Sequence, residues 1–429
     1  MPANPITKAY VFVDLPSETE PVVAGMLEIG AGGGRFVYGR SYLGRKDSFA
    51  LDPLNLPLLD TTQEIRGNDG VPAVMLDAGP DNWGKKLMLA LHTRHPQNKL
   101  EELLATKGTG VGTIRVSTSR TRPKTEPVYQ ALESLTSINE NIQTLLSRGD
   151  ITEDLLRQLE PGSSMGGARP KSVVQDTDGS LWIAKFTRPD DIYDQSKAEQ
   201  MCYLMMRDCD IDTADTELTE VAQRSVLLVK RFDIAPYGRR HFISAHALQY
   251  RPKVRETELD SIYSYPVLAD KINQIGSEPN DKRELFKRMV FNVAIGNTDD
   301  HLRNHGFIKN TEDNFYRLSK AYDVVPQITS TGQQAISLGA GGRYSSIESC
   351  IESAPYFGVS PEEASEIIGH TLDVVSQWEA YADLVEMIPA DRSVLKGTVE
   401  RFLPKRSIDY QTLNKMIDAD NPVQQKPKT

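Results

Sequence analysis

Three polar residues in the second half of the chain have the types and the spacing of a phosphoryl-transfer site. Asp299 is followed five residues later by Asn304, and Asp323 comes further along the chain. Phosphoryl transfer asks a protein mainly to position its reactants and to neutralise charge. A carboxylate at Asp299 could orient an attacking hydroxyl and take its proton, while oxygens of Asn304 and Asp323 suit Mg²⁺. This order of base and metal ligands is typical of protein kinases.

The residues around this triad predict the elements that would position it. Apolar residues repeat at helical spacing over 286–294 and indicate one buried helix face. We expect Asp281 and Glu284 to start this helix as a capping box, and Gly296 to end it. Two strand-like runs flank turn-forming residues over 306–318 and predict a hairpin. The hairpin would separate the polar loop from the second aspartate.

Upstream parts of a nucleotide site occur in the order that a kinase needs. Residues 161–171 form a small glycine-rich loop whose backbone could approach phosphates closely. Residues 180–186 predict a strand, and Lys185 within it occupies the place of the lysine that holds the α- and β-phosphates. The candidate nucleotide-binding residues in and beside the loop are Ser164, Gly166, Gly167 and Lys171.

A helix and a second strand should follow this lysine. The spacing of apolar residues from Ala198 to Met205 predicts an amphipathic helix, on which Glu199 could pair with Lys185. The run over 226–229 is continuously apolar and typical of a buried strand. Residues 230–233 come next, where a nucleotide-binding hinge would lie.

Taken together, these segments resemble the HipA family of bacterial serine/threonine kinases, the toxins of HipBA-type toxin–antitoxin modules. The segments that carry the resemblance are GGARPK (166–171), WIAKF (182–186), KRFD (230–233), NTDDHLRNHGF (297–307) and AYDVVP (321–326). Two further segments are similar to the N-terminal subdomain of that family, namely LDAGPDNWGKKLM (76–88) and GVG (110–112). The resemblance therefore covers nearly the whole chain.

The resemblance implies an α+β, two-lobed protein-kinase-like fold with an extra N-terminal α+β subdomain and a mainly helical C-terminal lobe. It implies ATP and Mg²⁺ as cofactors, with Lys185 on the ATP phosphates, Asp299 as catalytic base, and Asn304 and Asp323 on Mg²⁺. Backbone groups of Phe232 and its neighbours would face adenine. The remaining members of the predicted nucleotide-binding set are Arg231 and His301.

Two positions in these motifs leave a choice between neighbouring residues. Ser164 falls where family members carry a regulatory autophosphorylated serine, and Ser163 is the alternative. Family members often have glycine after the catalytic aspartate, whereas this chain has Asp300. Either aspartate could therefore be the base, and the five-residue offset to Asn304 favours Asp299.

The resemblance also implies a biological role and partners. A HipA-like toxin would inhibit growth by phosphorylating a cellular protein, with a translation component such as an aminoacyl-tRNA synthetase as the suggested target. A small HipB-like helix-turn-helix antitoxin would neutralise it. Operator DNA would be bound mainly through that antitoxin.

Composition limits the class of protein. The 429 residues correspond to two or three domains at roughly 100–200 residues each. A formal net charge of -10 argues against a general nucleic-acid-binding protein, which needs a basic face. The three cysteines form no CxxC pair and suit a reducing cytoplasm. No signal-peptide pattern or membrane-spanning stretch is evident, so we expect a cytoplasmic protein without a membrane partner.

The chain divides into three predicted parts. Residues 1–120 would form the N-terminal subdomain, 128–250 the kinase small lobe, and 255–420 the helical lobe with the catalytic loop. Residues 115–127 are polar, basic and proline-containing, and predict a linker. Further helices are expected over 83–92, 361–387 and 389–403.

Three other functions fit parts of the sequence. Asp299, Asp300, His301 and His305 could form a metal site for phosphoester hydrolysis, but this leaves Lys185 and the glycine-rich loop unexplained. The spacing of the two histidines is also that of a zinc protease motif, which lacks its glutamate here. A non-catalytic pseudokinase that acts as a binding module is the third alternative.

Overall fold

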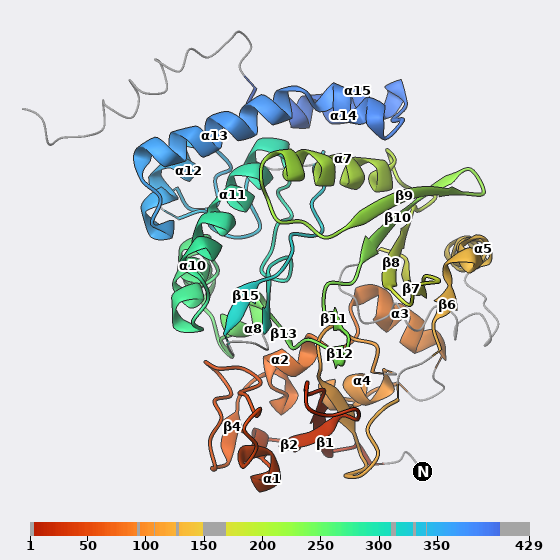
Figure 1. The fold of residues 1–429 in the computed structure, drawn as a ribbon, viewed down its shortest axis with the longest axis vertical. Coiled ribbons are helices and arrows are strands. Elements are labelled where there is room, and N and C mark those ends of the chain that lie inside the picture. Colours follow the sequence, from red (N-terminus) through yellow and green to blue (C-terminus); the bar gives the residue numbers. More distant parts are fainter. Residues whose placement is uncertain are drawn as a thin grey trace, which may run out of the picture.

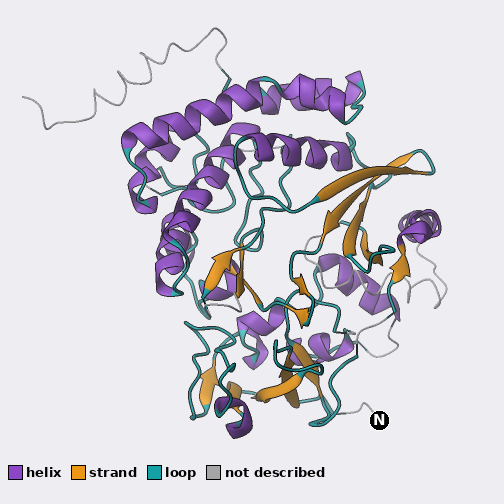
Figure 2. Ribbon diagram, viewed as in Figure 1, coloured by secondary structure: helices purple, strands orange, loops and turns teal. Residues whose placement is uncertain are grey.

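The computed structural model of the chain describes residues 4–91, 95–106, 108–125, 128–148, 169–309, 315–328, 332–339 and 341–403. Figure 1 shows three regions: an N-terminal subdomain at the bottom, a second sheet on the right, and a group of long helices at the top and left. Figure 2 shows that the first two regions combine strands with helices, whereas the third is mainly helical. The chain therefore has the α+β, two-lobed fold with an extra N-terminal subdomain that its motifs predicted.

The N-terminal subdomain is built on a five-stranded sheet in the order β4-β3-β2-β1-β5, in which every neighbouring pair is antiparallel. Alternating residues of β3 are buried, as expected for a sheet with one face on the core. Its elements are β1 (Lys8–Val13), β2 (Val22–Gly30), β3 (Gly33–Tyr38), α1 (Arg40–Leu43), β4 (Gln63–Ile65), α2 (Ala73–Leu76), α3 (Asn82–Leu91), α4 (Lys99–Ala105) and β5 (Arg115–Ser117).

The strand β5 corrects the predicted linker, which began at Arg115. This residue starts a strand that pairs with β1, and its side chain is buried. Its guanidinium lies 3.0 Å from the Asp14 carboxylate and donates to the carbonyl of Lys124. The basic composition of the segment suggested a solvated linker, but an acidic partner far away in the sequence allows this arginine to be buried.

The small lobe contains the second five-stranded sheet, in the order β6-β7-β8-β10-β9. Strands β7 to β10 pair antiparallel, and β6 runs parallel to β7. Trp83 and Leu87 of α3 belong to the same hydrophobic cluster as Trp182 and Phe186 of this sheet, so a helix of the N-terminal region completes the core. Its elements are β6 (Gln130–Ala131), α5 (Leu135–Arg148), β7 (Lys171–Gln175), β8 (Leu181–Phe186), α7 (Gln195–Asp208), β9 (Thr216–Val221) and β10 (Arg224–Lys230).

The remainder of the described chain forms the helical lobe and a three-stranded sheet, β13-β14-β15, that carries the catalytic loop. The elements up to this sheet are β11 (Ile234–Ala235), β12 (Gly238–Arg239), β13 (Phe242–Ser244), α8 (Ala245–Leu248), α9 (Leu259–Ile262), α10 (Tyr265–Gln274), α11 (Pro279–Ile295), β14 (Gly306–Lys309) and β15 (Tyr316–Leu318). The helices after it are α12 (Ile347–Ser353), α13 (Pro361–Ser376), α14 (Trp378–Leu384) and α15 (Pro389–Val399).

Helix α11 is the central element of this lobe, and the structure corrects how it begins. The predicted capping box at Asp281 is wrong, because the N-cap is Glu278 and Pro279 is the first helical residue. Proline suits that position since its missing N–H would have no helical partner there. Asp281 instead accepts hydrogen bonds from the hydroxyl of Ser277 and the backbone N–H of Leu318. It thereby ties the start of the helix to β15.

The end of α11 agrees with the sequence. Gly296 has a φ of 77°, in the left-handed region that favours glycine, and it stops the helix just before the polar loop. The predicted hairpin is present as β14 and β15.

The helix expected over 361–387 is divided at Gln377 into α13 and α14. Throughout the described ranges, no helix combines the length and hydropathy needed to cross a bilayer.

Candidate active site

Three of the predicted site residues meet through Lys185. Its ammonium lies 2.6 Å from the Glu199 carboxylate on α7 and 2.8 Å from the Asp323 carboxylate, which follows β15. Strand β8, helix α7 and the segment after the hairpin therefore converge on one ion-paired cluster, although Lys185 and Asp323 are 138 residues apart.

The charges of this cluster depend on one another. Burial alone would lower the pKa of Lys185, but Asp323 and Glu199 outweigh it and raise that pKa above its ordinary value. The Lys185 ammonium lowers the pKa of Asp323 to about 2, against an opposing effect of burial. Burial raises the pKa of Glu199 despite the nearby lysine. Asp323 and Glu199 therefore both stabilise the charged form of Lys185.

Asp323 is held by an unusual backbone conformation. Its φ is 63°, in the left-handed region, where aspartate and asparagine are among the few non-glycine residues that occur with any frequency. Its backbone N–H donates to the hydroxyl of Tyr203 at 3.4 Å. The Asp323 side chain is 42% exposed, so its carboxylate is accessible to a ligand while it contacts Lys185.

The structure separates the two neighbouring aspartates of the catalytic loop. Asp299 is exposed, whereas Asp300 is only 1% exposed. The Asp300 carboxylate accepts a hydrogen bond from the Tyr265 hydroxyl and contacts Nε2 of His305 at 3.0 Å. Asn292 on α11 donates to the same tyrosine hydroxyl at 3.2 Å. Asp300 therefore anchors the loop to α10 and α11, and Asp299 points out of the fold.

Asp299 has the electrostatic surroundings of a proton acceptor. Burial raises the pKa of its carboxyl group, and the neighbouring Asp323 and Asp300 raise it further, while His301 acts in the opposite direction. A carboxylate with a raised pKa binds a proton more readily, which suits a general base. The same His301 helps to lower the pKa of Asp323, so this imidazole lies within electrostatic reach of both carboxylates.

The residues present fit a magnesium–nucleotide ligand. Within the described chain, the buried Nδ1 atom of His301 has no hydrogen-bond partner, and a bound group could supply one. Asn304 lines a small pocket with Tyr322 and Val324, the two chain neighbours of Asp323. Its backbone N–H donates to the carbonyl of His301 at 2.8 Å, which closes the loop. The side-chain oxygens of Asn304 and Asp323 are of the kind that a hard cation such as Mg²⁺ prefers.

Other predicted nucleotide-binding residues have protein partners. Lys171 on β7 forms a buried ion pair with Asp81 of the N-terminal subdomain at 2.8 Å. Its role toward a nucleotide remains a prediction. The predicted loop residues Ser163, Ser164, Gly166 and Gly167 lie outside the described residues.

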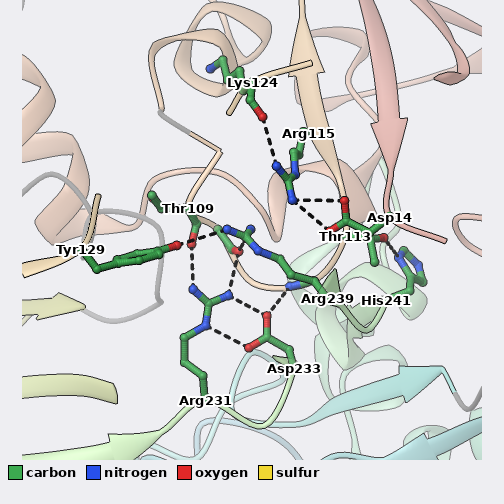
Figure 3. A network of polar contacts seen from close by, with 12 residues as sticks. Asp14, Thr109, Thr113, Arg115, Lys124, Tyr129, Arg231, Asp233, Arg239 and His241 are labelled. Atoms are coloured by element: carbon green, nitrogen blue, oxygen red, sulfur yellow. Dashed lines mark hydrogen bonds and ion pairs between the residues drawn. The ribbon is translucent and has the colours of Figure 1, made fainter. Parts of the chain in front are cut away.

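The predicted hinge is tied to the N-terminal subdomain by the network in Figure 3. The Arg231 guanidinium donates to the Asp233 carboxylate at 3.0 and 2.7 Å, and to the carbonyls of Thr109 and Gly110 at 3.3 and 3.2 Å. The backbone N–H of Gly112 donates to Asp233 at 2.8 Å. Burial opposes ionisation of Asp233, but Arg231 outweighs it and lowers the pKa. The Arg231 side chain thus binds protein groups, and a hinge contact with adenine would use backbone.

Phe232 lies between the hinge and the catalytic segment. Its half-buried ring is 5.7 Å from the ring of Tyr322 and 6.5 Å from that of Phe242, measured between ring centroids. Tyr322 precedes Asp323, and its hydroxyl donates to the carbonyl of Arg303 in the catalytic loop. The hinge, the metal-ligand candidate and the loop are therefore linked by one chain of contacts.

The N-terminal subdomain also contacts the lobe that carries the catalytic loop. Asp77 accepts hydrogen bonds from the backbone N–H and the hydroxyl of Ser244 at 2.8 and 2.7 Å, and lies 3.8 Å from the Arg303 guanidinium. Asn55 donates to the carbonyl of Ala247 at 3.1 Å. The subdomain therefore contacts both lobes, through Asp81 on one side and Asp77 on the other.

Sequence reasoning missed Tyr265 and Asp81, which support the site without belonging to its motifs. The sequence marks Tyr265 only by its place after Ser264, a serine that caps the start of a helix. Asp81 follows a proline and precedes a helix, a pattern that indicates an N-cap but not its lysine partner.

Comparison with known proteins agrees with this geometry. Residues 163–378 match the model of a family described as HipA-like C-terminal domain. No curated protein sequence matches the chain. Among solved structures, HipA of the Shewanella oneidensis MR-1 toxin–antitoxin system, in a complex with HipB and operator DNA, is similar with a TM-score of 0.66 and 15% identity, covering 91% of this chain and 97% of that one. At this identity the likeness shows the fold.

A second solved structure is much less similar. The proinflammatory kinase CtkA of Helicobacter pylori has a TM-score of 0.35 and 13% identity, and covers 53% of this chain and 94% of its own.

Proposed function

Because the chain belongs to the HipA-like family, we propose that it is an ATP- and Mg²⁺-dependent protein serine/threonine kinase that acts as the toxin of a type II toxin–antitoxin system. The observation that carries this proposal is the cluster in which Lys185 contacts both Glu199 and Asp323, with Asp299 exposed nearby. An ion pair between a strand lysine and a helix glutamate, beside a metal-binding aspartate, is what a kinase needs to place ATP.

Each residue of the cluster has a defined task in this proposal. Lys185 binds the phosphates, and Glu199 holds the lysine in place from α7. Asp299 orients the hydroxyl of the substrate and takes its proton. Asn304 and Asp323 hold Mg²⁺, which when bound neutralises negative charge on the phosphates.

The burial of Asp300 supports Asp299 as the base. Asp300 already accepts hydrogen bonds from Tyr265 and lies against His305, so its carboxylate faces the protein interior. The same contacts disfavour the hydrolase alternative, because two of its four metal ligands are turned toward each other. The assignment of these roles remains a proposal.

The partners follow from the family and from the likeness to HipA. The HipA in the similar structure is in a complex with HipB and operator DNA. We propose that this chain likewise binds a HipB-like helix-turn-helix antitoxin in the cytoplasm, and reaches operator DNA mainly through it. The net charge of -10 favours such indirect DNA binding. A translation component such as an aminoacyl-tRNA synthetase remains the proposed target.

Phosphoryl transfer from ATP is the decisive test. The purified chain should incorporate phosphate from Mg-ATP into itself or into a protein substrate, and omission of Mg²⁺ should stop the reaction. Asp299→Asn is the inactive control. Release of phosphate from a simple phosphoester without ATP would favour the hydrolase, whereas Mg-ATP binding without any transfer would favour the pseudokinase.

A further inference from the structure

A single buried carboxylate joins the N-terminal subdomain to the strand beside the candidate ATP lysine. Asp81 Oδ2 lies 2.8 Å from Lys171 Nζ, and the two side chains are 8% and 2% exposed. The other oxygen, Oδ1, accepts from the backbone N–H of Gly84 at 2.6 Å, and the Asp81 carbonyl accepts from the N–H of Lys85 at 2.8 Å. This is the geometry of a helix N-cap. Asp81 therefore starts α3 and binds the β7 lysine at the same time.

Lys171 and Lys185 are directly opposite each other in the antiparallel pair of β7 and β8. Residues in this relation share one face of the sheet, with Cβ atoms about 4.5–5.5 Å apart, and like charges there repel. Lys185 is compensated by Glu199 and Asp323. Asp81 compensates Lys171, so each cation of this pair has a carboxylate from a different part of the chain.

Lys171 is also within electrostatic reach of the nucleotide site. Burial and the neighbouring Lys185 lower the pKa of Lys171, while Asp81 and Asp323 act to raise it. In turn, Lys171 contributes to the lowered pKa of Asp323. Asp323 thus interacts with both lysines, and the position of Lys171 affects the carboxylate that contacts Lys185.

Helix α3 fixes the strand as well as its lysine. The indole Nε1 of Trp83 donates to the Lys171 carbonyl at 3.1 Å. Trp83 and Leu87 pack in the core of the small lobe beside Trp182. The N-terminal region therefore holds the backbone and the side chain of Lys171 through consecutive parts of one helix.

We propose that Asp81 is a positioning residue of the nucleotide site, which binds Lys171 and so leaves Asp323 available to Lys185 and the metal. This inference rests on the proposed function. Without the Asp81 charge, the buried Lys171 ammonium would be attracted to Asp323 and would compete with Lys185 for it. The N-terminal subdomain would then contribute directly to the affinity for ATP, through one carboxylate.

The test uses substitutions that keep the helix cap. Asparagine and serine are both good N-cap residues, so Asp81→Asn and Asp81→Ser remove the charge but retain an oxygen for the Gly84 N–H. Asp178→Asn is the matched control, since it makes the same change of charge in the exposed turn between β7 and β8. Thermal unfolding of each full-length variant shows that the fold is retained.

The expected result is a loss of Mg-ATP affinity with little effect on the chemical step. Calorimetry should give a Kd for Mg-ATP about 10-fold higher in both Asp81 variants, the lower end of what removing a supporting contact costs at a metal site. The KM for ATP should rise while kcat stays within about twofold, because a binding interaction and not the base has been changed. The control should behave like the wild-type protein.

A second substitution distinguishes positioning from a merely structural role. In Asp81→Glu a carboxylate remains at this position, so Mg-ATP affinity should stay closer to the wild-type value than in the two uncharged variants. An affinity in Asp81→Glu as low as in the uncharged variants would overturn the inference, as would an unchanged Kd in the uncharged variants of an ATP-binding protein. A wild-type chain that does not bind Mg-ATP would overturn the proposed function itself.

Discussion

The two adjacent aspartates of the catalytic loop should respond to the same substitution in opposite ways. Asp299→Asn removes an exposed carboxylate, so the fold and Mg-ATP binding should be retained. Because a general base typically contributes about 10²–10⁴-fold to the rate, phosphoryl transfer should fall by that factor. Asp300→Asn instead changes a buried carboxylate that accepts from Tyr265 and contacts His305.

The effect of Asp300→Asn on stability follows from these contacts. Both contacts reach the same carboxylate oxygen, Oδ2, and the amide oxygen of asparagine can take its place without the charge. A hydrogen bond to a charged group contributes about 1.5–3 kcal/mol and a neutral one about 0.5–1.5 kcal/mol, so the loss of charge at two contacts should destabilise the protein by about 2 kcal/mol at a residue that is only 1% exposed. A domain of 150–250 residues loses roughly 2–4 °C in Tm for each kcal/mol, so a shift of several degrees is expected.

The assay compares three quantities for the two variants and the wild-type protein. These are the initial rate of phosphoryl transfer at saturating Mg-ATP, the Kd for Mg-ATP, and the Tm. The reasoning is refuted if Asp299→Asn keeps the full rate while Asp300→Asn remains as stable as wild type and is inactive. The base would then be the buried residue, and the loop would have to rearrange to expose it.

Three further predictions concern binding, pH and control. Lys185→Ala and Asp323→Asn should each weaken Mg-ATP binding, measured by calorimetry, and abolish toxicity on overexpression; unchanged affinity in both would defeat the site. Burial raises the pKa of Asp77 to about 6, so the folded state binds this proton more tightly than the unfolded chain, in which the pKa is about 3.9. The free energy of unfolding should then decrease as the pH rises from about 4 to about 6, and Asp77→Asn should lack this slope in urea titrations. Ser164, or Ser163 in its place, should become autophosphorylated and lower the affinity for ATP, because the added phosphate carries nearly two negative charges that repel the γ-phosphate; an active enzyme with neither serine phosphorylated in mass spectrometry would contradict this.

Local patterns predicted the parts of the site that depend on short stretches of sequence. The periodicity before Gly296, the strand that carries Lys185 and the helix that carries Glu199 all agree with the structure, because each is determined by apolar spacing within about ten residues. The order of these elements also carried enough information to indicate a kinase-like fold.

Contacts between distant polar residues could not be predicted in the same way. Asp81 and Lys171 are 90 residues apart, Tyr265 and Asp300 are 35 apart, and each member alone resembles an ordinary surface residue. The wrong linker at Arg115 has the same origin, since its burial depends on the distant Asp14. The helix start predicted at Asp281 was wrong for the opposite reason. Glu284 was a plausible partner nearby in the sequence, but Asp281 contacts Ser277 and β15 instead.

The left-handed backbone of Asp323 restricts which residues evolution or an experimenter can place there. A side chain with a Cβ generally costs about 1–2 kcal/mol in this conformation, and only glycine, asparagine and aspartate adopt it readily. Aspartate alone among these carries a carboxylate, so no other residue at this position preserves both the backbone conformation and the negative charge. An alanine variant would combine loss of the ligand with conformational strain, and could be misread as evidence for a larger chemical role. Asparagine is therefore the suitable substitution for a catalytically inert protein used to trap substrates or an antitoxin.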